Sequence, residues 1–194
     1  MKSYFATLSL TACCAWTISA QDIRQPAQDV SYPNASTSNS SIDVGFGPEG
    51  GAEALVVKTI NSAKVSIRLA AFAFSSPLIV QALVAAKRRG VDIQIVVDQK
   101  HNVEEDKKRI SRTALNALVG ANIPVRTNSD YRLHHDKFII VDTRHIQTGS
   151  LNYASSANRN SENVLVVWND PGLAAKYLAH WESRFRNGAD YSQK

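Results

Sequence analysis

The sequence contains very little cysteine, and none of it lies in the body of the chain. Its 194 residues include two cysteines, Cys13 and Cys14, which are adjacent and close to the N-terminus. If the first residues are removed on export, no thiol remains. From the sequence we therefore expect neither a disulfide framework nor a thiolate metal site.

Several cofactor-binding signatures are also missing. The sequence has no GxxxxGK phosphate loop, no dinucleotide-binding glycine pattern and no zinc-ligand spacing. It has no internal repeat either. These absences disfavour the nucleotide-dependent enzymes and the zinc proteins, and they leave activities that side chains alone can perform.

The first 20 residues have the features of a secretory signal. Lys2 precedes a largely apolar stretch, residues 4–16, and small residues at 17–20 offer a cleavage point. We expect residues 1–20 to be cleaved and the protein to be exported, either to the periplasm or outside the cell. A lipoprotein signal at Cys13 is the minor alternative. The stretch is too short and polar for a comfortable membrane span, so we expect no stable membrane insertion after cleavage.

Residues 21–44 are rich in Ser, Asn, Pro and Gln and have no apolar period, which is typical of a flexible segment. We expect one folded domain at 45–194. The net charge is +5 and the isoelectric point about 9.3. A basic excess of this size favours phosphate-bearing partners, although a basic protein without such a partner is about equally compatible with it.

The domain alternates between helical and extended patterns. Ser76 and Pro77 form a helix-start signal, and Gly90 follows a basic last turn that suits the helix dipole. We expect helices at 52–62, 77–89, 110–119 and 172–187, strands at 65–74, 91–97, 123–125, 138–141, 145–148 and 163–168, and a polar loop at 99–108. This order predicts an α/β fold with helices on both faces of a sheet.

One stretch organises the chain: His135-Asp136-Lys137, an apolar run to Val141, Asp142, and then Gly149-Ser150-Leu151-Asn152. On an extended segment, side chains two residues apart share a face, so His135 and Lys137 point the same way. Asp142 is an odd number of positions from both. We therefore expect it on the other face, in a structural hydrogen-bonding or ion-pair role.

The stretch HDKFIIVD has the pattern HxKxxxxD, and with the following GSLN it resembles the signature of the phospholipase D superfamily. From about residue 45 to 191 the chain is similar to the small bacterial endonucleases of that superfamily, the Nuc type. The resemblance is carried by the segments GFGPEGGAEALVV, SAKVSIRLAAFAFSSP, ALVAAKRRGVDIQIVVD, NSENVLVVW and HWESRFRNGADY. It implies a phospholipase D-like fold with a mixed sheet, and cleavage of phosphodiesters.

The residue types in this stretch suit that chemistry. His135 can supply a nucleophilic nitrogen, and Lys137 can hold a phosphate oxygen as a point charge. Ser150 and Asn152, two residues apart, can donate hydrogen bonds to the same phosphate. Glu162 is a candidate partner for the second nitrogen of His135. The resemblance implies the same roles and includes Asp142 in the catalytic motif. We expect neither a metal nor a cofactor.

An in-line displacement needs a proton donor opposite the nucleophile, and the motif occurs once. His134 faces the other way on a strand, so it is a poor second histidine. The resemblance implies an isologous homodimer that brings two His135 side chains to one cleft, because longer members of the superfamily carry the motif twice. We therefore predict a dimer with its active site on the two-fold axis.

The leading functional hypothesis is a sequence-nonspecific, metal-independent nuclease acting on DNA. A phospholipase is the main alternative, disfavoured because no amphipathic insertion helix is apparent. A non-catalytic nucleic-acid binder is the other. Among the remaining histidines, His101 is the best candidate for a substrate contact, whereas His145 and His180 are expected to be structural.

Overall fold

The computed structural model describes residues 39–49 and 51–192. The predicted signal at 1–20 and most of the predicted flexible segment lie outside these residues. The end of that segment was placed too late, because strand β1 already begins four residues before the expected domain start. It occupies Ser41–Gly47 and pairs with β7 along its whole length.

The strands form one mixed sheet, as predicted, and their order is β1-β7-β6-β5-β2-β3-β4-β8. Three neighbouring strands, β2, β3 and β4, run parallel, and the other pairs are antiparallel. The parallel strands are β2 (Ser66–Ala71), β3 (Asp92–Asp98) and β4 (Val125–Asn128). The others are β5 (Lys137–Val141), β6 (His145–Gly149), β7 (Glu162–Trp168) and β8 (Ala189–Asp190).

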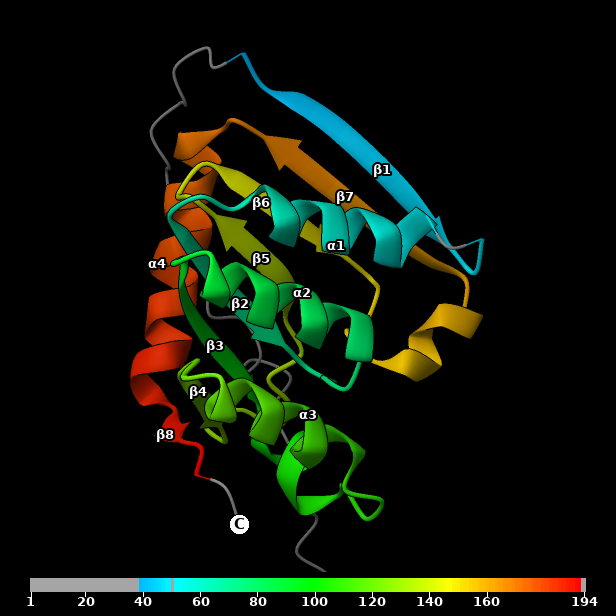
Figure 1. Cartoon of the computed structure of the whole chain (residues 1–194), viewed down its shortest axis with the longest axis vertical. Coiled ribbons are helices and arrows are strands. Elements are labelled where there is room, and N and C mark those ends of the chain that lie inside the picture. Colours follow the sequence, from blue (N-terminus) through cyan, green and yellow to red (C-terminus); the bar gives the residue numbers. More distant parts are fainter. Residues whose placement is uncertain (1–38, 50, 193–194) are drawn as a thin grey trace, which may run out of the picture. The chain divides into compact units, whose positions relative to one another are not determined.

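Helices cover both faces of the sheet (Figure 1). One face carries α1 (Gly51–Ser62), α2 (Pro77–Arg88) and α3 (Ile110–Gly120), and the other carries α4 (Pro171–Asn187). Because successive side chains of a strand point to opposite faces, each strand contributes residues to the cores on both faces of the sheet. In β2, Ile67 and Leu69 belong to the large core under α1–α3, while Ala70 belongs to the smaller core with Trp181 of α4.

The helix signals work as expected. The Ser76 side chain caps α2 by accepting a hydrogen bond from the backbone N–H of Ile79, and Pro77 occupies the first turn. Gly90 ends the helix with a positive φ of 91°, which favours glycine. Arg89 donates to the carbonyl oxygens of Ile60 and Asn61, so it ties α2 to the end of α1.

The predicted polar loop at 99–108 is wrong in one part. It contains a single π-helical turn, Lys100–Glu104, followed by a short turn into α3. A second short turn, the 3₁₀ helix Ser155–Arg159, follows the GSLN segment. Two strands also differ from expectation: 65–74 shortens to β2, and 123–125 moves on to β4. Among the described residues, no helix is both long and apolar enough to span a bilayer.

The strand arginine Arg68 is an ion-pair partner on the α4 side of the sheet. Its guanidinium group lies 2.5 Å from the Asp92 carboxylate and 5.7 Å from the centre of the Trp181 ring. A cation over an indole face that is partly shielded from water contributes to packing as well as charge balance. Arg68 is therefore a structural residue between β2 and α4.

Candidate active site

The central motif lies at one end of β5. That strand begins at Lys137, so His135 and Asp136 belong to the loop before it rather than to the strand itself. The predicted proximity of the two side chains is nevertheless confirmed. The Lys137 ammonium group lies 3.2 and 3.3 Å from the two ring nitrogens of His135, and it donates to the His135 carbonyl oxygen at 2.9 Å. His135 is exposed, so its ring is accessible to a substrate.

Aromatic rings support this pair. The Phe72 ring lies 4.6 Å from the His135 ring, and the Lys137 ammonium group is 5.4 Å from the Phe72 centroid. On its other side, Phe72 contacts His101 at 4.5 Å. His101, the best candidate for a substrate contact among the remaining histidines, is thus separated from His135 by one ring. Sequence reasoning missed Phe72, because nothing in its local pattern distinguishes it from the neighbouring core residues.

The buried Asp98 carboxylate fixes the backbone ahead of the motif. It lies at the end of β3 and accepts hydrogen bonds from the backbone N–H groups of His134, at 2.8 Å, and His101, at 2.6 Å. A charged acceptor with two backbone donors is a strong connection. Asp98 therefore joins the two loops that carry His101 and His135. Its place at the end of a parallel strand was the available sequence signal.

A buried amide, Asn102, holds the segment that carries Phe72. Its side-chain nitrogen donates to the carbonyl oxygens of Phe72 and Asp98, and its side-chain oxygen accepts from the Phe74 N–H at 2.9 Å. All three hydrogen bonds are made inside the fold, where a lost partner is costly. The π-helical turn that carries Asn102 therefore positions Phe72 against His135.

The GSLN segment lies beside the start of β7. Ser150 donates a short hydrogen bond to the Glu162 carboxylate and accepts from the Asn163 N–H at 3.0 Å. A Cβ on Gly149 would meet the Asn163 carbonyl oxygen at 2.2 Å, so only glycine lets β6 and β7 approach this closely. The Asn152 side-chain oxygen is buried and has no partner among the described protein atoms.

Glu162 differs from expectation in its contacts. Within the described part of the chain it accepts hydrogen bonds from Ser150 and from the Asn160 amide, at 3.2 Å for the latter, rather than from His135. Its charge still acts on the site. Burial lowers the pKa of Lys137, the carboxylates of Asp136 and Glu162 oppose that effect, and the pKa remains below its usual value. The pairing of Glu162 with His135 stays a prediction.

Asp142 lies at the opposite end of β5 from the pair. Its carboxylate accepts hydrogen bonds from three successive backbone N–H groups, those of Lys64, Val65 and Ser66, at 2.7 to 2.9 Å. Burial raises the pKa of Asp142, but the three backbone donors outweigh it and hold the pKa below its usual value. The geometry agrees with the structural role expected from strand parity, away from the reacting phosphate.

The other histidines are held by neighbours. The His180 Nε2 atom lies 2.9 Å from the Asp136 carboxylate. His180, which was expected to be structural, therefore also contacts a residue of the HDK motif. His134 is buried, with its Nδ1 atom 3.6 Å from the same carboxylate. His145 accepts a hydrogen bond from the Asn169 N–H. In the described residues, no group of three or more His, Cys, Asp or Glu side chains is arranged to hold a metal ion.

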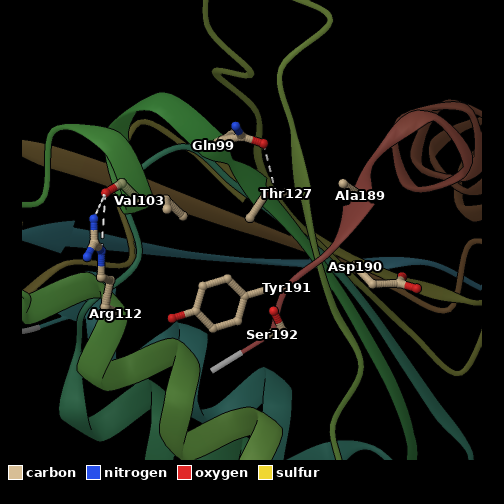
Figure 2. A pocket seen from close by; sticks show the side chains of 8 residues that line it. All are labelled: Gln99, Val103, Arg112, Thr127, Ala189, Asp190, Tyr191 and Ser192. Carbon is tan, nitrogen blue, oxygen red and sulfur yellow. Dashed lines mark hydrogen bonds between the residues drawn. The ribbon is translucent and has the colours of Figure 1, made fainter. Parts of the chain in front are cut away.

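A hollow of about 290 Å³ lies beyond β4, between the π-helical turn and the C-terminal residues. Figure 2 shows its side chains: Arg112 points to the Val103 carbonyl, Gln99 points to Thr127, and the Tyr191 ring lies between the walls. Arg112 already donates from Nε and Nη2 to the Val103 carbonyl oxygen, and no motif residue lines this space. It is therefore separate from the candidate active site.

A family model described as "Cardiolipin synthase, PLD-like domain" matches residues 56–185, which include the whole motif. The chain belongs to the phospholipase D superfamily. It is 35% identical to a phospholipase D of Rickettsia bellii over 159 residues, covering 81% of this chain and 76% of the relative. It is also 35% identical over 116 residues to human mitochondrial cardiolipin hydrolase, covering 59% of this chain and 44% of that protein.

Among solved structures, the phospholipase D family member Nuc from Salmonella typhimurium is similar in fold, with a TM-score of 0.75 and 47% identity. The match covers 78% of this chain and 98% of Nuc. Both the superfamily and the Nuc type expected from the motif are thereby confirmed. As a member of the phospholipase D superfamily, the protein is a phosphodiesterase, a hydrolase of phosphodiester bonds.

Proposed function

We propose that the protein hydrolyses the backbone of nucleic acids, DNA in the first place, without a metal and through a phosphohistidine intermediate. The observation that carries this proposal is the contact between Lys137 and both ring nitrogens of the exposed His135. The ammonium group attracts a phosphate oxygen to the place where the ring nitrogens of His135 lie. Ser150 and Asn152 supply further polar groups for the phosphate.

The reaction proceeds in two displacements. A ring nitrogen of His135 forms a bond to phosphorus while the bond to the leaving oxygen breaks, and the partner's His135 gives that oxygen a proton. In the second displacement, a water molecule gives a proton to the partner's His135. The water oxygen forms a bond to phosphorus while the phosphorus–nitrogen bond breaks. Both histidines return to their starting states. Glu162, through Ser150 or directly, stabilises positive charge on the imidazole.

The second histidine requires a dimer, and one surface of the sheet supports it. On β1, Ile42, Val44 and Phe46 are 61%, 54% and 59% exposed. These three side chains lie on the sheet face that carries α4, and α4 packs mainly against β2 to β6. An apolar row on an edge strand is a liability unless something covers it.

A second copy of the chain is the occupant that fits. The row ends at Phe46 and Gly47, which pair with Asn163 and Glu162, so it is continuous with the active-site edge of the sheet. Packing two such faces about a two-fold axis buries both rows and brings the two sites toward each other. This arrangement is the predicted isologous homodimer with one shared cleft.

Nucleic acid is preferred over lipid for two reasons. The chain is basic, with a net charge of +5. It also matches Nuc at 47% identity over almost all of that protein, and the sequence resembles the Nuc type, the small bacterial endonucleases of the superfamily. The relatives named phospholipase D make a phospholipid the alternative substrate. We further propose that the protein is exported, on the basis of residues 1–20.

One experiment separates the alternatives. Purified protein is incubated with plasmid DNA and, separately, with phosphatidylcholine vesicles, each in excess EDTA. The proposal expects DNA cleavage in EDTA and acid-labile label on His135 when reaction mixtures are trapped. Cleavage of vesicles alone identifies a phospholipase, cleavage of neither with DNA binding retained identifies a binder, and rescue only by a divalent ion contradicts the metal-free mechanism.

A further inference from the structure

A second cleft, of about 420 Å³, lies next to the candidate active site. This size falls within the range of sites that hold small ligands or parts of larger ones. Its polar lining includes Ser75, His101, Lys107, Lys108, Ser111 and Ser156. These residues come from three segments: the residues between β2 and α2, the stretch from the π-helical turn to the start of α3, and the 3₁₀ turn after GSLN.

Residues that line this cleft lie next to residues of the candidate active site. Ala73 lines it and directly follows Phe72, whose ring contacts His135. Ala154 lines it and lies two residues after Asn152. His101 lines it as well, and one aromatic ring separates His101 from His135. A polymer bound with one phosphate at His135 therefore has this cleft as its neighbouring surface.

The carboxylates that line the cleft have partners within the protein, whereas two of its lysines have no carboxylate partner among the described residues. The Glu105 carboxylate pairs with Lys100 at 3.5 Å, and the Asp106 carboxylate accepts hydrogen bonds from the backbone N–H groups of Ile110 and Arg112. Lys107 and Lys108 are exposed, and in the described part of the chain neither ammonium group has a carboxylate partner. Two cations without a carboxylate partner thus remain beside the hydroxyl groups of three serines, together with the Asp106 carboxylate, which is held by backbone N–H groups.

We infer that this cleft binds a backbone phosphate of the nucleic acid strand, flanking the linkage that His135 attacks. Lysine ammonium groups and serine hydroxyls are suited to phosphate oxygens and read no bases, so the contact positions the strand without sequence preference. The inference rests on the proposed nuclease function and adds a subsite to it. It predicts that substrates with more than one phosphate gain from the cleft, whereas a single phosphodiester does not.

The test compares two substrates and two double variants. The variant Lys107→Gln/Lys108→Gln removes both free cations of the cleft. The control Lys87→Gln/Arg88→Gln removes the same charge from the last turn of α2. The helix α2 has 12 residues and is therefore about 18 Å long. Its last turn lies at the end farther from Ser75, which precedes the first turn. The substrates are a single-stranded oligonucleotide and bis(p-nitrophenyl) phosphate, which has one phosphodiester.

For the oligonucleotide, we expect the cleft variant to lower kcat/KM by about tenfold or more at moderate salt, mainly through KM. The slope of log(kcat/KM) against log[salt] should flatten by roughly one unit, since fewer counterions are released on binding. For the small ester the loss should be far smaller, and the control variant should match the wild type on both substrates.

Each outcome decides something. Equal loss on both substrates means that the loop acts on the reacting centre, and it overturns the subsite. Equal oligonucleotide kinetics and salt slopes in the cleft variant and the control also overturn it. If the wild type cleaves vesicles but no oligonucleotide, the proposed function itself fails. Thermal unfolding of both variants checks that neither change has disturbed the fold.

Discussion

The exposed ring of His135 contacts both the Lys137 ammonium group and the Phe72 ring. We predict that His135→Ala abolishes turnover, by about 10⁴-fold or more, because a nucleophile has no substitute in a two-step displacement. Steady-state cleavage of plasmid DNA measures the loss. Circular dichroism and thermal unfolding should match the wild type, since the side chain is exposed.

The matched control is His145→Ala. His145 pairs with Val141 at the opposite end of β5, and its ring accepts a hydrogen bond from the Asn169 N–H. This change should cost some stability but keep turnover within a few-fold of the wild type, as expected for one lost hydrogen bond far from the reaction. Normal cleavage by His135→Ala would place the nucleophile on another side chain.

A second residue-scale prediction concerns His134, which is 2% exposed. Burial lowers the pKa of His134, against the opposing charges of Asp136 and Asp98 and with smaller lowering effects from Arg184 and His180. The folded pKa is thus below the unfolded value of about 6.5. As the pH falls below that value, the unfolded chain binds a proton that the folded protein does not. The folded state therefore loses stability on acidification.

The variant His134→Asn removes this proton uptake and should flatten the dependence. We expect the wild-type free energy of unfolding to fall more steeply between pH 7 and pH 5, by up to about 1.4 kcal/mol per pH unit from this group. Urea unfolding of both proteins across that range measures the difference. Parallel curves would show that His134 takes up a proton equally well in the folded and unfolded states.

At the scale of elements, the Asp142 carboxylate joins the end of β5 to the segment that leads into β2. Its three backbone donors, at residues 64–66, come from 76 to 78 positions earlier in the chain. We predict that Asp142→Ala lowers the free energy of unfolding by about 2–3 kcal/mol, because three N–H groups lose a charged acceptor. Urea denaturation measures the loss, and Asp130→Ala, an exposed carboxylate, serves as the control.

The pH dependence of that stabilisation has a definite sign. The folded pKa of Asp142 is lowered, so its contribution is complete above the unfolded value of about 3.9 and is lost as the pH falls through the folded pKa. The stability gap between wild type and Asp142→Ala should therefore narrow in acid, below about pH 4. DNA cleavage should survive at neutral pH, and its complete loss would give Asp142 a catalytic role.

The contrast between α2 and the π-helical turn explains how much of the fold the sequence predicts. The Ser76 cap, Pro77 and Gly90 lie next to the helix that they delimit, so the pattern predicted α2 almost to the residue. The turn at Lys100–Glu104 depends on Asn102, whose partners Phe72 and Phe74 are about 30 residues away in sequence. Tertiary hydrogen bonds of this kind leave no local pattern.

The candidate site divides in the same way. The spacing of His135 and Lys137 predicted their contact, because two residues of extended chain set it directly. The supporting residues are Phe72, just after β2, and Asp98, at the end of β3, and the sequence alone did not point to them. Glu162 was found by its chemistry, but its hydrogen bond to Ser150 depends on how closely β6 approaches β7.

For the whole molecule, the decisive surface is the apolar row on β1. The sequence reasoning assigned residues 41–44 to a flexible segment, although Ile42, Val44 and Phe46 alternate with Asp43 and Gly45 as a strand requires. The alternation is short and follows a polar stretch, so the sequence pattern did not predict a strand at these residues. The row is exposed in a single chain, and the proposed dimer would bury it.

We predict that Val44→Lys/Phe46→Lys converts the dimer to monomers and removes most of the activity. Each dimer would bring four ammonium groups into an apolar contact, costing several kcal/mol, and about 4 kcal/mol corresponds to a thousandfold increase in Kd. Analytical ultracentrifugation measures the mass, and DNA cleavage measured over a range of protein concentrations reports the active species.

The control is Val65→Lys/Leu78→Lys, which adds the same charge at two other exposed apolar side chains, 68% and 55% exposed. Neither lies on the β1 row, so this variant should stay dimeric and active. The decisive measurement is the dependence on concentration. Because each site of the proposed dimer needs a histidine from both chains, specific activity should fall on dilution in step with the loss of dimer. A wild-type monomer with full activity at every concentration would exclude the shared cleft, and the proton donor would then have to be found within one chain.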